Sequence, residues 1–109
     1  MMTYCKTCLP PAEIKQTENG YIIIMELPGS FRDDIKIWQE NGILTITGEK
    51  KAPSGDRIFS ERVFGEFTRS FRLPEDVDLD KIEANYSDGV ITVEIPKQES
   101  VKPRNIKIK

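Results

Sequence analysis

The segment Asp88-Gly89-Val90-Ile91-Thr92-Val93-Glu94-Ile95-Pro96 has a counterpart 47 positions upstream, in Asn41-Gly42-Ile43-Leu44-Thr45-Ile46-Thr47. Each copy begins with an Asp-Gly or Asn-Gly pair, which is typical of a tight hairpin turn, and continues as a strand rich in apolar residues. Two copies are too few for a solenoid. The repeat instead predicts two related hairpins, one on each facing sheet of a β-sandwich.

The bulk composition is that of one globular domain. The chain has 109 residues, of which 31% are charged and 38% apolar, and its formal net charge is −2. That charge is too close to zero to indicate nucleic acid as a partner. Without an apolar run of about 18 residues or a signal-peptide pattern, we expect a cytoplasmic protein with no membrane partner. Histidine is absent, which excludes the catalytic triads and metal sites that require it.

No segment shows sustained helical periodicity, so we expect an all-β, immunoglobulin-like sandwich. Turn signals, including Asn19-Gly20, separate eight expected strands at residues 12–17, 21–27, 35–39, 43–49, 58–63, 67–73, 82–86 and 90–95. Alternation within the strands predicts that seven side chains lie in the core: Leu44, Ile46, Phe67, Phe71, Ile91, Val93 and Ile95. We divide the chain into a flexible N-terminal segment (1–11), the sandwich domain (12–96) and an extended C-terminal tail (97–109).

The repeat also predicts a groove. Strands 35–39 and 82–86 occupy equivalent places, one in each sheet. If both are edge strands on the same side of the sandwich, a groove opens between them. Its predicted lining is Ile35, Ile37, Ile82 and Ala84.

The chain resembles the small heat-shock protein family, whose members share the α-crystallin domain. The resemblance covers about residues 11–109 and rests on five motifs in the family's order and spacing. They are Leu27-Pro28-Gly29, residues 41–49, residues 64–74 with their Phe-Arg-Leu-Pro end, residues 88–96, and the tail motif Ile106-Lys107-Ile108.

This resemblance implies an ATP-independent holdase, a chaperone of the stress response that binds partly unfolded clients and limits their aggregation. Such a protein is not an enzyme and needs no cofactor, and the chain indeed lacks a phosphate-loop motif. The family also implies homodimers that assemble into larger oligomers. In bacterial and plant members, the loop before strand 67–73 pairs with the partner subunit, a role that falls here on Ile58, Phe59 and Arg62.

Two further expectations concern assembly. Arg69 should share a face with Phe67 and Phe71, and the resemblance places it in an ion pair near the dimer interface. The alternative is an arginine whose stem packs inward while its head reaches solvent. In the tail, Ile106 and Ile108 alternate around one outward residue, so we expect them to insert into the groove of another chain by strand addition.

Other functions stay open at this point. An adaptor of the related CS-domain type would bind one folded partner, but that class predicts neither the Ile-x-Ile tail nor the Phe-Arg-Leu-Pro strand. A thiol or metal protein would use Cys5 and Cys8, whose spacing suits a redox pair or half of a zinc site. Neither a helix start nor further ligands accompany them, so we favour incidental thiols and predict no metal site. Only about 11 residues precede the first strand, whereas relatives usually carry a long client-binding arm. We therefore expect weaker client binding per subunit.

Overall fold

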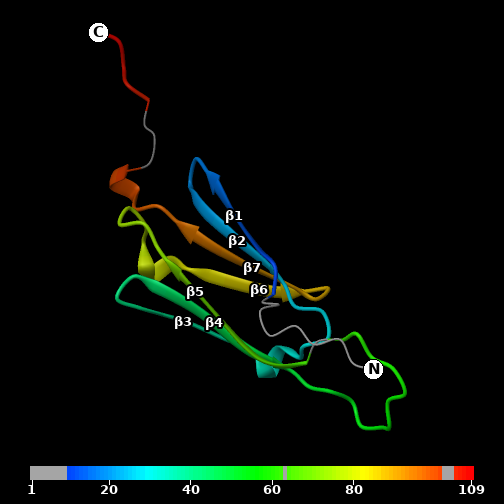
Figure 1. Ribbon diagram of the computed structural model, residues 1–109. Helices are drawn as coiled ribbons and strands as arrows, with labels where there is room; N and C mark the ends of the chain where they lie inside the picture. The colour runs from blue at the N-terminus through cyan, green and yellow to red at the C-terminus, as the bar shows by residue number, and fades with distance from the viewer. Residues whose placement is uncertain (1–9, 63, 102–104) are drawn as a thin grey trace.

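The computed structural model describes residues 10–62, 64–101 and 105–109. Within these ranges the chain forms two antiparallel sheets that face each other (Figure 1). The strands are β1 (Ala12–Thr17), β2 (Gly20–Glu26), β3 (Lys36–Glu40), β4 (Ile43–Lys50), β5 (Gly65–Arg72), β6 (Glu83–Ser87) and β7 (Val90–Pro96). Three single 3-10 turns are η1 (Arg32–Asp34), η2 (Leu79–Lys81) and η3 (Glu99–Val101). The predicted all-β sandwich is confirmed.

The sheet order determines which strands have an unpaired edge. One sheet runs β1-β2-β7-β6 and the other β3-β4-β5. Strands β3 and β6 are therefore both edge strands, as the repeat predicted. They lie on the same side of the sandwich, because Arg32, just ahead of β3, donates a hydrogen bond to Tyr86 of β6. The other two edges belong to β1 and β5.

The two related hairpins, β3–β4 and β6–β7, have the same backbone conformation. Their turns place both residues at positive φ, 54° and 76° for Asn41 and Gly42 and 53° and 76° for Asp88 and Gly89. This is the conformation that Asn-Gly and Asp-Gly pairs favour in two-residue turns. The pairing register of the second hairpin equals that of the first, displaced by 47 positions.

Each hairpin turn accepts a backbone hydrogen bond from a Leu-Pro pair that follows the neighbouring strand of the same sheet. The Leu27 N–H, directly after β2, donates to the Gly89 carbonyl at 2.7 Å, and the Leu73 N–H, directly after β5, donates to the Gly42 carbonyl at 2.8 Å. Each Leu-Pro pair thus fastens its strand to the turn of the adjacent hairpin. The repeat therefore includes the strand before each hairpin, because β2 pairs with β7 and β5 pairs with β4.

The core lies between the sheets and contains one alternate set of side chains from each central strand. Six of the seven predicted core residues are buried, and Phe71 is half-buried against them. The buried apolar residues are Ile23, Met25, Leu27, Leu44, Ile46, Phe67, Leu73, Val77, Ile91, Val93 and Ile95.

The first hairpin turn differs from the prediction by one residue. Thr17 pairs with Gly20, so the turn consists of Glu18 and Asn19, and Gly20 is the first residue of β2. Glycine is required at position 20 by packing, because a Cβ there would overlap the carbonyl oxygen of Ile95 in β7. The Asn-Gly signal was therefore assigned to the wrong cause.

The expected strand at 58–63 is not formed by residues 58–62, and Val63 lies outside the described residues. The connection from β4 to β5 extends away from the sandwich (Figure 1). A strand needs a continuous row of paired backbone groups, and among residues 58–62 only Ser60 has a bridge-type pairing.

Candidate functional site

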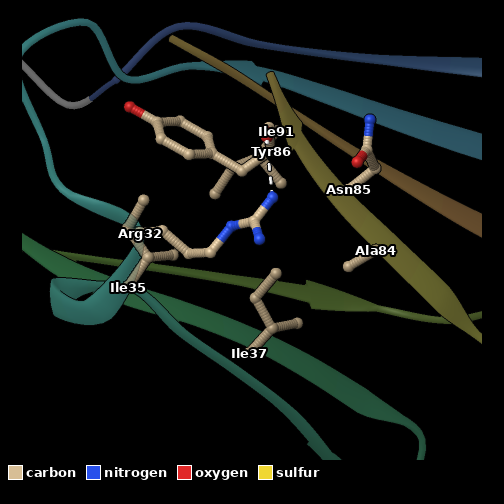
Figure 2. A pocket seen from close by; sticks show the side chains of 7 residues that line it. All are labelled: Arg32, Ile35, Ile37, Ala84, Asn85, Tyr86 and Ile91. Atoms are coloured by element: carbon tan, nitrogen blue, oxygen red, sulfur yellow. Dashed lines mark hydrogen bonds between the residues drawn. The ribbon is translucent and has the colours of Figure 1, made fainter. Parts of the chain in front are cut away.

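The structure has a cleft of about 460 Å³ between the edges of β3 and β6. We call this cleft the mouth. Figure 2 shows side chains from both sheets converging on it. The mouth is lined by Arg32, Ile35, Ile37, Ala84, Asn85, Tyr86 and Ile91.

Three of the four residues predicted to line the groove do so. Ile35 and Ile37 come from the β3 side, and Ala84 comes from β6. The fourth, Ile82, packs partly buried against the core and lines a neighbouring depression with Tyr21 and Ile22. The hydrogen bond from Arg32, just ahead of β3, to Tyr86, near the end of β6, shows that the start of β3 lies beside the end of β6. Ile82, just ahead of β6, therefore lies at the opposite end of the groove from Ile35.

Sequence reasoning missed Tyr86, which closes one end of the mouth. Its hydroxyl lies 2.9 Å from the Leu27 carbonyl and 2.8 Å from the Ser30 carbonyl, and it donates to either. The loop between β2 and β3 is thereby tied to β6. Period-two alternation from Ala84 would have placed Tyr86 on the same face.

Arg32 was missed as well, and no motif pointed to it. Its Nη2 donates to the Tyr86 carbonyl at 3.3 Å, so the side chain crosses from the β3 side of the mouth to β6 (Figure 2). This bond also shows that the Tyr86 carbonyl faces the open edge. Backbone groups of an edge strand alternate between its neighbour and the free side, so the Ala84 carbonyl faces the mouth too.

The tail motif is exposed in the single chain. Ile106 and Ile108 are 90% and 97% exposed. The beginning of the tail is fixed, because the Lys97 N–H donates to the Asn19 carbonyl and the Gln98 N–H to the Asp76 carbonyl, both at 2.8 Å. Residues 105–109 lie away from the sandwich beyond η3 (Figure 1).

The predicted dimer residues lie in two places. Ile58 and Phe59, in the β4–β5 loop, are 98% and 67% exposed. Arg62 of the same loop lies over the Phe64 ring, 4.6 Å from its centroid. Arg69 lies on β5, outside this loop, and is half-buried.

Arg69 makes two contacts within the single chain. Its Nη1 donates to the Pro10 carbonyl at 2.9 Å, and its guanidinium lies 5.3 Å from the centroid of the Phe71 ring. No ion pair involves Arg69 in the described part of this single chain. Within one chain a backbone carbonyl is thus the hydrogen-bond acceptor of Arg69, and the ion pair near the dimer interface stays a prediction.

One apolar residue on the β1 edge was also missed. Ile14 pairs with the buried Ile23 and so points to the inner side of its sheet, yet it is 57% exposed. Strand β1 is an edge strand of the four-stranded sheet, so Ile14 lies at the border of the core.

The described residues hold no group of three or more potential metal ligands. Cys5 and Cys8 lie outside the described ranges, so the structure says nothing of the thiol or metal alternative. In the part of the chain that is described, no helix has the length and apolar character needed to cross a membrane.

The chain is similar to known proteins over nearly its whole length. Residues 13–109 match the Hsp20/alpha crystallin family. The small heat shock protein C2 of Rickettsia felis is 38% identical over 108 residues, covering 95% of this chain and 70% of that protein.

Two solved structures share the fold. Heat shock protein 16.0 of Schizosaccharomyces pombe has a TM-score of 0.80 at 34% identity, covering 97% of this chain and 87% of that one. A small heat-shock protein of Xylella fastidiosa has a TM-score of 0.78 at 37% identity, covering 94% and 97%. The chain therefore belongs to the Hsp20/alpha crystallin family, the small heat-shock proteins, which are chaperones that need no ATP and catalyse no reaction.

Proposed function

We propose that this chaperone is a holdase, which binds partly unfolded proteins and limits their aggregation, and that it assembles from dimers. The observation that carries the proposal is the mouth. Two unpaired strand edges flank a cleft with four apolar lining residues there, so an incoming extended segment gains both backbone hydrogen bonds and apolar contacts.

The tail of a second chain is the first ligand we propose for the mouth. In an extended conformation Ile106 and Ile108 share one face, and they would enter the mouth beside Ile37 and Ala84. Burying two isoleucines contributes about 3–6 kcal/mol, and association costs a large part of that gain. A single tail should therefore bind with a Kd from about a millimolar to tens of micromolar.

Weak tails still build assemblies when several act together. A dimer carries two tails and two mouths, and linkage raises the effective concentration of the second contact. Subunits would exchange readily, and an emptied mouth would be open to an apolar strand of a client. The relative from Xylella fastidiosa is described as having a distinct high order structure.

The β4–β5 loop is the element we propose for the dimer. Its exposed Ile58 and Phe59 would reach the β1 edge of the partner, where Ile14 is uncovered. Arg62 and Arg69 would border this contact. A loop of residues 51–64 is long for a compact sandwich unless it has a role of its own.

Light scattering of a heat-labile enzyme, heated without ATP, tests the holdase proposal. We expect suppression that rises with chaperone dose, against no effect from an equal mass of an inert protein. Aggregation that proceeds unchanged at equal mass would contradict it.

Sedimentation tests the assembly. Ile106→Ser with Ile108→Ser should reduce the particle to a dimer without unfolding it, and deletion of residues 54–62 should give a monomer. Lys107→Ser is the matched control for the tail, since its side chain alternates outward. A double variant that sediments like the parent would exclude the tail as the assembling element.

A further inference from the structure

Arg32 is the one charged side chain among the seven that line the mouth. The single turn η1 holds it there, because the Asp34 N–H donates to the Phe31 carbonyl at 3.0 Å and the Ile35 N–H donates to the Arg32 carbonyl at 3.1 Å. The guanidinium extends across the mouth to the Tyr86 carbonyl (Figure 2). A cation therefore occupies the end of the mouth beside Tyr86, while Ile35, Ile37, Ala84 and Ile91 supply its apolar lining.

This guanidinium has no carboxylate partner in residues 10–62, 64–101 and 105–109. The ion pairs formed there are Lys51 with Asp34 at 3.4 Å and Lys81 with Asp78 at 3.9 Å. Asp34, next to Arg32 in η1, is thus already paired with a lysine. An arginine has five N–H donors in a planar fork that suits a carboxylate, and one hydrogen bond to a carbonyl leaves most of them available.

Strand addition at this edge requires the acceptor that Arg32 occupies. A segment that pairs with β6 as far as Tyr86 needs the Tyr86 carbonyl, so its arrival displaces the guanidinium. A segment with a carboxylate at that end offers Arg32 a new partner, whereas one with a cation leaves it displaced beside a like charge.

The protein's own tail is of the second kind. Residues 97–109 carry five basic side chains and one acidic one, Glu99, which is distant from the Ile-x-Ile motif. The apolar pair is flanked by Arg104 and Asn105 on one side and by Lys109 on the other. Whichever direction the tail runs, it brings a cation or an amide to the Arg32 end of the mouth.

We propose that the mouth prefers client segments of the apolar-x-apolar type that carry a carboxylate beside the apolar pair, and that Arg32 is the residue that selects them. This inference rests on the proposed docking role of the mouth. It makes the basic tail a weak occupant that acidic client strands displace. Release of the tail is then coupled to the chemistry of the client.

Peptide binding measured by fluorescence anisotropy tests the inference. The protein is the full chain with Ile106→Ser and Ile108→Ser, so that its own tails do not compete. The peptides span residues 101–109 with blocked ends, as the parent sequence and with Arg104→Glu, Lys109→Glu or Lys107→Glu. The Lys107→Glu peptide is the matched control, because it has the same charge change on the residue that points out of the mouth.

We expect Arg104→Glu or Lys109→Glu to bind on the order of fivefold tighter than the parent peptide at low salt. The peptide whose affinity rises identifies which end of the motif lies beside Arg32, and therefore the direction of the added strand. The gain should shrink at high salt, since exposed charges are screened. It should vanish in Arg32→Gln protein and persist in Lys36→Gln protein, which loses a cation from the outer face of β3.

Equal affinity for all peptides would overturn the role of Arg32 while leaving the mouth as a docking site. An increase in affinity that persists in Arg32→Gln protein would overturn that role too. So would an equal increase in affinity for the Lys107→Glu peptide. If the parent peptide does not bind at all, the docking site itself is wrong, and this inference falls with the proposed function.

Discussion

The hairpins β3–β4 and β6–β7 have the same turns, the same register and the same Leu N–H bond to the turn glycine, yet they present different side chains to the mouth. Ile37 on β3 corresponds to Ala84 on β6, and Tyr86 of the mouth corresponds to Gln39, which lies outside it. Arg32 of η1, which lines the mouth, corresponds to Leu79 of η2, which does not. The repeated residues set the backbone frame, and the positions that differ determine the chemistry of the site.

This difference gives the mouth two unlike ends. A site built from two identical hairpins would carry the same group at both. Here only the end near Tyr86 has a guanidinium, and only that end has a tyrosine tied to the β2–β3 loop. An extended ligand therefore meets a cation at the Tyr86 end of the mouth, and the apolar side chains Ile37 and Ala84 further along it.

The largest effect should come from the repeated core. Ile46 and Val93 are equivalent residues on β4 and β7, and each is fully buried. We expect Ile46→Ala to reduce the free energy of unfolding by about 2–5 kcal/mol and Val93→Ala by about 1–3 kcal/mol, because the larger side chain leaves the larger cavity. Urea denaturation at matched protein concentration measures both. A larger loss for Val93→Ala would mean that the core relaxes around the cavity at Ile46 more than around the cavity at Val93.

The turn glycines come next. Alanine at either position is forced into the left-handed region, which costs about 1–2 kcal/mol. At Gly42 an added Cβ meets nothing within 4 Å, whereas at Gly89 it lies 3.2 Å from the Pro28 Cα. Gly89→Ala should therefore destabilise by about 1 kcal/mol more than Gly42→Ala. Equal costs in thermal denaturation would show that the loop at Pro28 moves aside freely.

Sequence alone predicted what repeats and what alternates. The 47-residue repeat located both hairpins and both edge strands, and alternation located the core. It failed where a residue is set by a distant contact. Gly20 is fixed by the backbone of β7, not by the turn that its Asn-Gly pair suggested.

Only part of the mouth was predictable from the sequence, because some of its residues are placed by distant contacts. Ile35, Ile37 and Ala84 follow from strand period. Ile82 is the counterpart of Ile35 in the repeat, but the start of β3 lies beside the end of β6, so the two isoleucines lie at opposite ends of the groove. The bond between Arg32 and Tyr86 joins positions 54 apart in the chain. These positions do not correspond in the repeat, so no local pattern encodes their contact.

The third effect concerns Tyr86 and its counterpart Gln39. Tyr86→Phe removes the donor to the Leu27 and Ser30 carbonyls, and we expect a loss of about 1 kcal/mol in the free energy of unfolding. Gln39→Ala is the matched control, an exposed position where the change should stay within about 0.5 kcal/mol. Urea denaturation measures both. If Tyr86→Phe were as mild as Gln39→Ala, the loop would not depend on this hydroxyl.

The smallest expected effect on stability concerns β2 and β5, the strands that precede the two hairpins. The two Leu-Pro pairs align Tyr21 of β2 with Phe67 of β5. Their rings differ by a hydroxyl, which lies 3.3 and 3.4 Å from the two carboxylate oxygens of Asp76. These distances are long for an O–H···O bond, so removing the hydroxyl should change stability little and be visible mainly in titration.

The pKa of Tyr21 lies above its ordinary 10.0 because of burial first, and then because of the charge and hydrogen bond of Asp76. A raised pKa means that folding favours the protonated hydroxyl. Its contribution to stability is therefore complete below pH 10.0 and is lost as the pH rises through the raised value. Absorbance titration of tyrosinate, as the difference between the parent and Tyr21→Phe, should give a midpoint above 10.0. Asp76→Asn should lower that midpoint but leave it above the ordinary value, since burial is the larger cause. An unchanged midpoint in Asp76→Asn would mean that the carboxylate does not interact with the Tyr21 hydroxyl. Tyr21 on β2 would then differ from Phe67 on β5 only by a hydroxyl without a partner there.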